Sequence, residues 1–278
     1  MTSSWHEVGD RVFVRRYSDW HGEPFDQNAG VVLGADGALV IDTRASHRLA
    51  DVLIAEVREL TSLPIAAVVN THHHWDHSWG NARFLPAPIW GHVRCGPRML
   101  ERSPRILERI LADEPGLAEE LQEVVVTPPT RTIDESGTID LGDRQVELRY
   151  LGRGHTDNDI VVIVPDARVL FAGDLLENNA SPSFGDAYPI AWADTVARLL
   201  PLAGDAVVPG HGSVGGRPFA ERQAGEFALI AQLGRDVVSG AIGEDEATSR
   251  SPFPADVTAI AVERARLELA EEPIGRHA

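Results

Sequence analysis

The sequence predicts a layered α/β fold. Short apolar runs of strand length recur in both halves of the 278-residue chain, and segments with helical spacing lie between and after them. The chain is long enough to bury a large core. We find no linker that would divide it, so we expect a single domain over residues 1–278.

The first part of the chain is predicted to be strand-rich. Gly34-Ala35-Asp36-Gly37 separates two apolar runs, which predicts a hairpin. A helix capped by Ser46 should follow, because leucine and valine recur at helical spacing behind it. The run 65–69 is apolar throughout, as in strands covered on both faces. The strands predicted here are 12–14, 29–33, 38–42, 65–69 and 89–90.

Residues 97–124 are predicted to form short helices inserted between sheet elements, broken by Pro104 and Pro115. Strands then resume, with one helix over about 192–200. The remainder, 218–270, reads as a C-terminal helical extension with a break near 251–254. The later strands are predicted at 137–139, 146–150, 160–164, 169–172 and 206–208.

The composition excludes several classes of function. The formal net charge is −17, so we expect neither nucleic acid nor a membrane surface as a partner. The absence of lysine excludes a Schiff-base or phosphate-loop lysine. The only cysteine, Cys95, excludes a cysteine-rich metal site and is expected to be buried. No run is long enough to span a membrane, and residues 1–10 lack a secretory signal, so we expect a cytoplasmic location.

A histidine cluster directly follows the predicted strand 65–69. Residues 71–77 read Thr-His-His-His-Trp-Asp-His and contain the pattern H-x-H-x-D-H. His72 and His74 point the same way in an extended chain, and imidazole and carboxylate ligands suit zinc and similar ions. Asp76 and His77 are adjacent and would diverge, so they could serve a second ion. His73 alternates away and should pack or face solvent.

Three further candidates stand near the ends of predicted strands. His155, Asp174 and His211 each have glycine or small neighbours. Glycine lets the backbone turn sharply and lets a metal approach closely. We therefore expect these side chains to join the histidine cluster.

With these four blocks in this order, the sequence resembles the metallo-β-lactamase-fold superfamily of metallohydrolases over roughly residues 8–216. The resemblance implies a four-layer αββα sandwich with a dinuclear site at one edge. It also implies a ligand set, in which the first metal is held by His72, His74 and His155, the second by Asp76, His77 and His211, and both by Asp174.

Differences from individual branches of the superfamily reduce the number of candidate activities. The β-lactamases of this superfamily have cysteine or serine where Asp174 stands, which makes that activity a weaker hypothesis. The aspartate is similar to that of the thioesterase, lactonase and phosphodiesterase branches. Flavin-linked di-iron oxidoreductases have glutamate where His74 stands, and the nuclease branch suits a basic chain better.

The leading hypothesis is a hydrolase with two zinc ions and a bridging hydroxide that cleaves an activated acyl compound, such as a thioester or a lactone. Asp76 would be both ligand and local proton acceptor. Manganese or iron would accept the same ligands. The alternatives are a persulfide dioxygenase with one iron and a binding protein that has lost catalysis. The sequence leaves the oligomeric state open.

Candidate substrate contacts are less specific. Trp75 flanks the cluster, and the segment 17–27, with Trp20 and Phe25, is either a flap or an exposed loop. Arg153 and Asn158, beside His155, could contact a carboxylate or an oxyanion. Two further residues have open roles: Asp42 either orients a metal-binding histidine or caps a turn, and His92 is structural or lies behind a ligand.

Overall fold

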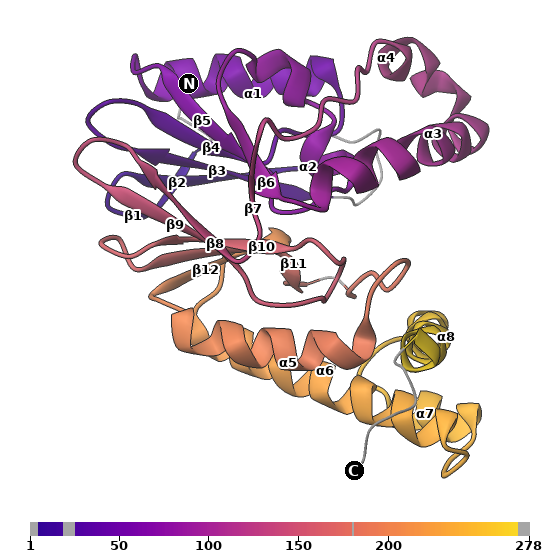
Figure 1. Cartoon of the computed structure of the whole chain (residues 1–278). Coiled ribbons are helices and arrows are strands. Elements are labelled where there is room, and N and C mark those ends of the chain that lie inside the picture. The colour runs from indigo at the N-terminus through magenta and orange to yellow at the C-terminus, as the bar shows by residue number, and fades with distance from the viewer. Residues whose placement is uncertain (1–4, 19–25, 180, 272–278) are drawn as a thin grey trace.

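The computed structural model describes residues 5–18, 26–179 and 181–271. Two β-sheets pack face to face, and helices cover the outer face of each (Figure 1). This arrangement confirms the predicted four-layer αββα sandwich. No helix among the described residues has the length and apolar character needed to cross a lipid bilayer.

The N-terminal sheet has its strands in chain order. Strands β1 to β4 pair antiparallel, and β4 to β7 pair parallel. The predicted hairpin forms between β3 and β4, where the Gly34 amide donates to the Gly37 carbonyl. The strands are β1 (His6–Gly9), β2 (Val12–Tyr17), β3 (Gln27–Leu33), β4 (Ala38–Ile41), β5 (Ile65–Val69), β6 (Ile89–His92) and β7 (Arg131–Ile133).

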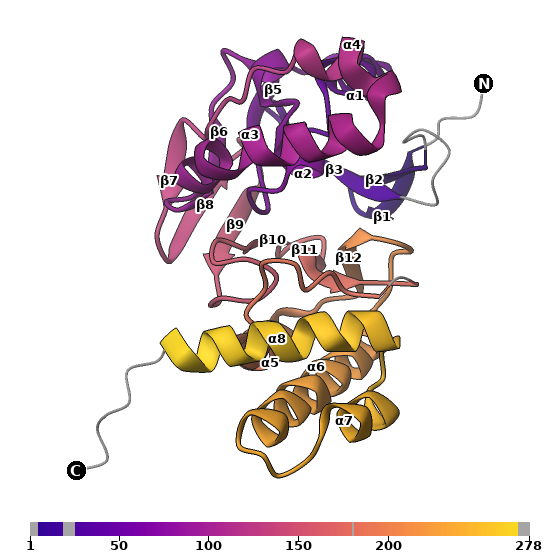
Figure 2. The same ribbon diagram turned by 90° about the vertical axis from the view of Figure 1, so that its right-hand side faces the viewer.

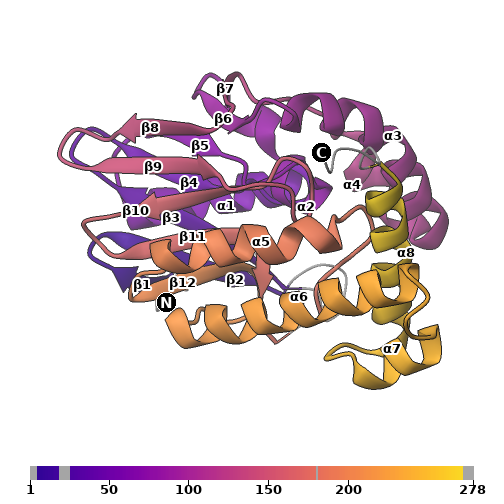
Figure 3. The same ribbon diagram turned by 60° about the horizontal axis from the view of Figure 1, so that its bottom comes forward.

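The C-terminal sheet has the order β12-β11-β10-β9-β8. Its strands pair antiparallel except β11 and β12, which run parallel. Figure 3 shows α5 and α6 lying side by side along this sheet. The strands are β8 (Ser136–Asp140), β9 (Gln145–Tyr150), β10 (Ile160–Val164), β11 (Val169–Glu177) and β12 (Ala206–His211).

The helices form the two outer layers. The predicted cap of α1 is confirmed, because Ser46 Oγ accepts a hydrogen bond from the Leu49 amide at 3.2 Å. Figure 2 shows α8 beside α5 and α6 and facing the viewer. The α-helices are α1 (His47–Leu60), α2 (Trp75–Ser78), α3 (Cys95–Asp113), α4 (Ala118–Gln122), α5 (Pro189–Leu199), α6 (Arg217–Val238), α7 (Glu244–Arg250) and α8 (Ala255–Glu271), with 3₁₀ turns η1 (Asn81–Phe84), η2 (Pro115–Leu117) and η3 (Leu200–Leu202).

The main core lies between the sheets. Leu39 and Val69 from one sheet and Val162, Phe171 and Val208 from the other belong to one buried cluster. Burial of this apolar surface is the main force that holds the sheets together. This packing therefore fixes the edge of one sheet where β5 ends relative to the edge of the other sheet where β11 and β12 end.

Three sequence predictions need correction. Pro104 does not break the inserted segment but lies inside α3, on its exposed side, where water can donate a hydrogen bond to the backbone carbonyl that proline leaves without a partner. Strands β1 and β7 were not predicted because they contain few apolar residues. Strand β11 does not end at Ala172 but continues to Glu177 past a register shift at Gly173.

Candidate metal centre

The loop after β5 is ordered by buried amides. Asn70 Nδ2 donates to the His77 carbonyl at 3.1 Å, and Asn81 Nδ2 donates to Asn70 Oδ1 at 2.8 Å. Helix α2 starts directly after His74, whose backbone is extended. The backbone of this one segment therefore positions four candidate ligands of the histidine motif, and the remaining candidate ligands come from other segments.

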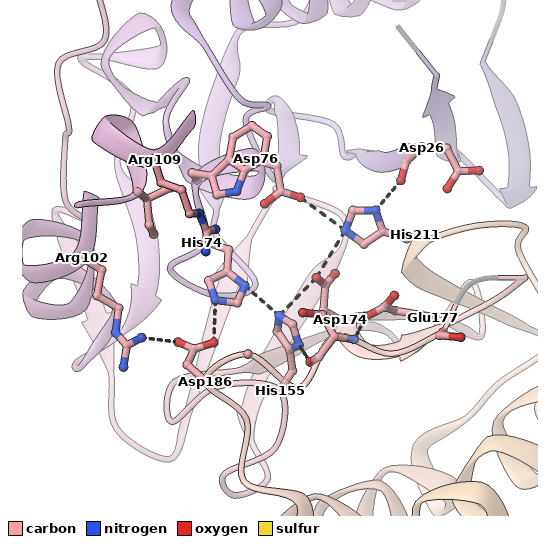
Figure 4. A pocket seen from close by; sticks show the side chains of 15 residues that line it. Asp26, His74, Asp76, Arg102, Arg109, His155, Asp174, Glu177, Asp186 and His211 are labelled. Carbon is pink, nitrogen blue, oxygen red and sulfur yellow. Dashed lines mark hydrogen bonds and ion pairs between the residues drawn. The ribbon is translucent and has the colours of Figure 1, made fainter. Parts of the chain in front are cut away.

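A first group of four side chains comes from three segments of the chain. His72 and His74 belong to the loop after β5, His155 to the loop between β9 and β10, and Asp174 to β11. His155 Nε2 lies 2.7 Å from His74 Nδ1 and 3.4 Å from Asp174 Oδ2, and the four ligand atoms lie within 4.8 Å of one another. Figure 4 shows His74, His155 and Asp174 converging.

A second group lies beside the first. It contains Asp76 and His77 from α2 and His211, the last residue of β12. Asp76 Oδ2 lies 3.0 Å from His77 Nε2 and 3.3 Å from His211 Nε2. The two imidazole nitrogens are themselves 3.3 Å apart.

Asp174 lies between the two groups. Its Oδ2 is 3.4 Å from His155 Nε2 and 3.3 Å from His211 Nε2, and its Oδ1 is 3.3 Å from His77 Nε2. The register shift of β11 at Gly173, which has φ +54°, precedes this residue, and a Cβ at Gly173 would press on Thr71. The aspartate therefore lies inside a strand, not in the loop that the sequence suggested.

The donor set fits cations. Imidazole nitrogens face each other at 2.7 Å and 3.3 Å, so each pair shares either a proton or a cation. His72 Nε2 is buried, has no hydrogen-bond partner and lies 3.6 Å from Asp174 Oδ2. Buried lone pairs of this kind are costly unless a proton or a metal satisfies them. Imidazole and carboxylate together are the ligands of zinc and related ions.

Opposite charges outweigh burial in the second group, that of Asp76, His77 and His211. Burial by itself would raise the pKa of Asp76, but His77 and His211 hold that pKa well below its usual range. Burial would lower the pKa of His77, but Asp76 and Asp174 raise it well above its usual range. The carboxylates are therefore ionised at neutral pH and need positive charge nearby.

A polar group contacts the other ring nitrogen of each candidate histidine ligand and fixes the orientation of the imidazole. Asp42 Oδ2 lies 2.8 Å from His77 Nδ1, which assigns Asp42 to orienting a candidate ligand. Thr71 Oγ1 lies 3.0 Å from His72 Nδ1, and Asp186 Oδ1 lies 3.0 Å from His74 Nε2. The Ser183 carbonyl lies 3.1 Å from His155 Nδ1, and the Asp26 carbonyl contacts His211 Nδ1.

Other singled-out residues lie outside the two groups. His73 is buried, with Nε2 3.5 Å from Asp186 and Nδ1 3.0 Å from the Asn158 amide. His92 contacts the Asp134 carbonyl at 3.1 Å and serves the structure. Cys95 is buried in the core, as expected, and Trp79 is buried as well.

A cavity of about 480 Å³ opens onto the two groups. Its wall includes residues that the sequence analysis did not single out, because nothing in their local pattern marks them. They come from α3 and from segments near the metal groups. The side chains lining the cavity are those of Asp26, His74, Trp75, Asp76, Arg102, Ile106, Arg109, His155, Asp174, Glu177, Ser181, Ser183, Asp186 and His211, with Gly185 completing the wall.

Among the predicted substrate contacts, some line the cavity and others lie elsewhere in the structure. Trp75 lines the cavity. Arg153 lies over the Tyr188 ring, 4.5 Å from its centroid, and Asn158 is buried against His73, so neither belongs to the wall. Trp20 and Phe25 lie outside the described residues, as do all of residues 19–25 within the segment predicted to be a flap or an exposed loop.

The fold and the clustered histidines and aspartates define a metallohydrolase, and the comparisons agree. A sequence model of the Metallo-beta-lactamase superfamily matches residues 22–211, and the chain belongs to this superfamily. It is therefore an enzyme of the metallo-β-lactamase fold.

Individual relatives are distant. The chain is 28% identical to the metallo-beta-lactamase type 2 of Bacillus cereus, over 70% of this chain and 71% of that protein. It is 26% identical to the acyl-coenzyme A thioesterase MBLAC2 of Bos taurus, over 81% and 87% of the two chains. The solved metallo-beta-lactamase of Pontibacter korlensis superposes with a TM-score of 0.67 at 21% identity, covering 81% of this chain and 98% of that one, which concerns the fold alone.

Proposed function

We propose that the protein is a hydrolase with a dinuclear site, loaded with zinc, that cleaves an activated acyl compound such as a thioester or a lactone. The observation that carries this proposal is the position of Asp174. One oxygen of its carboxylate lies 3.4 Å from His155 Nε2 and 3.3 Å from His211 Nε2, so it faces both ligand groups. A carboxylate in that position suits two cations better than one.

The first ion would be held by His72, His74 and His155, the second by Asp76, His77 and His211, and both by Asp174. Divalent ions held there would polarise the substrate and make hydroxide available near neutral pH. Asp76 would be the local proton acceptor, since its carboxylate lines the cavity beside the second group. Asp42 and Asp186 would keep His77 and His74 turned towards the ions.

An acyl substrate is supported by three observations. Aspartate, instead of cysteine, occupies position 174, and one relative covered over 87% of its length is named an acyl-coenzyme A thioesterase. Trp75 and Ile106 give the cavity an apolar wall that suits an acyl chain. A small-molecule substrate, no nucleic-acid partner and a cytoplasmic location complete the proposal.

Elemental analysis of protein purified without chelator tests the metal part. We expect two zinc ions per chain, and replacing Asp174 by alanine should lower the content below two and abolish metal-dependent turnover. One iron per chain together with oxygen uptake on glutathione persulfide would favour the dioxygenase instead. Full activity of the alanine variant with both metals retained would contradict the role of Asp174.

A substrate panel tests the reaction. Short-chain thioesters, a lactone and a cephalosporin are compared on the zinc-loaded enzyme by kcat/KM. We expect thioesters or lactones to be preferred. A clear preference for the cephalosporin would place the enzyme with the β-lactamases and overturn the proposed substrate class.

A further inference from the structure

One wall of the cavity is built by helix α3. Arg102, Ile106 and Arg109 follow one another at spacings of four and three residues, which places them on one face of the helix. All three line the cavity together with Trp75. Figure 4 shows Arg102 and Arg109 on the α3 side of the cavity, opposite Asp174 and His211.

The charge of this wall is opposite to that of the rest of the cavity. The other ionisable groups of the lining, apart from the histidines, are the carboxyls of Asp26, Asp76, Asp174, Glu177 and Asp186. Arg102 Nη1 lies 3.1 Å from Asp186 Oδ2, so part of its charge is already balanced. For Arg109 we find no ion pair or hydrogen bond in the part of the chain that the structure describes.

A free guanidinium at this place has a specific consequence for ligands. The chain as a whole carries a formal charge of −17 and repels anions. A guanidinium presents a planar fork of N–H donors that matches carboxylate, sulfate and phosphate oxygens. The apolar groups Trp75 and Ile106 lie in the same wall. A ligand that complements both the guanidinium and the apolar side chains of this wall therefore combines an apolar stretch with an oxyanion.

We propose that Arg109, assisted by Arg102, binds an oxyanion carried by the substrate, at a distance from the bond that is cleaved. This inference rests on the proposed function and narrows its substrate class to acyl compounds with a carboxylate, sulfate or phosphate group. The anion can belong to the acyl tail or to the leaving group, and the substrates below distinguish these two sources.

The kinetic test uses matched thioesters on the zinc-loaded enzyme. Glutaryl and pentanoyl thioesters differ in a charge at the end of the acyl tail, and esters of 3-mercaptopropionate and of propanethiol differ in a charge on the leaving group. We expect one charged member to exceed its uncharged partner about tenfold or more in kcat/KM, because only the charged member can accept a charge-assisted hydrogen bond from the guanidinium. In Arg109→Leu this charged-to-uncharged ratio should fall towards one.

The matched control is Arg105→Leu. Arg105 is an exposed arginine of the same helix that does not belong to the cavity wall, so its replacement should keep the wild-type ratio. The inference is overturned if neither pair shows a charge preference, or if Arg109→Leu keeps the preference.

A binding measurement separates this inference from the proposed function. Glutarate is titrated calorimetrically into zinc-loaded wild type, Arg109→Leu and Arg105→Leu. We expect at least tenfold weaker binding to Arg109→Leu alone, and equal binding to all three would overturn the anion site. Weaker binding to Arg109→Leu without hydrolysis of any thioester or lactone would support the anion site and contradict the proposed reaction. Hydrolysis without a charge preference would support the proposed reaction and contradict the anion site.

Discussion

The carboxylate of Asp42 lies 2.8 Å from Nδ1 of His77, at the side of the imidazole that faces away from the other candidate ligands. The same carboxylate accepts hydrogen bonds from the amide and the hydroxyl of Thr71, at 2.8 Å and 2.9 Å. Asp42 thereby links β4 to the loop after β5. A proton on His77 Nδ1 would satisfy this carboxylate and leave the Nε2 lone pair for a metal.

Replacing Asp42 by asparagine tests this link. An amide nitrogen facing Nδ1 would donate to it and drive the proton of His77 to Nε2. We expect a 10- to 100-fold weaker affinity at the group of Asp76, His77 and His211, measured by competition with a chromophoric chelator. Asparagine tolerates the φ of +61° at this position, so the fold should persist.

Asp51→Asn serves as its control, because Asp51 is exposed and paired with Arg83 on the surface. Its metal affinity should equal that of the wild type. Wild-type affinity in Asp42→Asn would show that Asp42 does not set the proton position on His77.

Gly210 should be essential for the metal centre although it offers no ligand atom. A Cβ at this position would collide with the Asp174 carboxylate, which has little room to retreat among buried histidines. We expect Gly210→Ala to lower the metal content below two per chain, as measured by elemental analysis. In Gly225→Ala the new methyl meets nothing within 4 Å, so the metal content should stay unchanged. Two bound metals in Gly210→Ala would contradict this account of how Asp174 is positioned.

Removal of metal should destabilise the protein more at high pH than at low pH. Without metal, Asp76 and Asp174 raise the pKa of His77 and His211 well above the usual value of 6.5. Because the folded pKa is the higher one, this stabilisation is fully present below pH 6.5 and is lost as the pH rises through the folded pKa. Metal binding requires unprotonated imidazoles and strengthens over the same range.

Melting temperatures with and without chelator at pH 6, 7.5 and 9 check this prediction. The gap between the two should widen as the pH rises. A gap that stays constant or narrows would mean that protons on these histidines do not replace the metal charge.

Asp159 should contribute a separate pH dependence. Burial raises its pKa to about 7, although Thr156 donates two hydrogen bonds of 2.7 Å to the carboxylate. Since the unfolded pKa is near 3.8, the stabilising contribution of Asp159 is fully present below about pH 4 and is lost as the pH rises through 7. The free energy of unfolding of Asp159→Asn minus that of wild type should therefore increase by a few kcal/mol between pH 4.5 and pH 8.

Denaturant unfolding at the two pH values measures this gain. Asp194→Asn, at an exposed position of α5, should show no such change. An equal difference between Asp159→Asn and wild type at both pH values would contradict a raised pKa in the folded protein.

The sequence by itself determined the features that depend on neighbouring residues. The cap at Ser46 and the hairpin at 34–37 are local, so residue types alone predict them. The histidine motif is local as well, because His72, His74, Asp76 and His77 lie within six positions. Together with the spacing of the later blocks, it was enough to predict the family.

Only the tertiary structure decided how separate segments meet. It gave Asp42 the role of orienting His77 over that of a cap, and it placed Arg109 and Asp186 in the cavity wall. It also kept Pro104 within α3 and directed Arg153 to Tyr188. These outcomes depend on which face of an element is buried and on what lies across from it. Such contacts join positions tens to more than a hundred residues apart, and no local period records them.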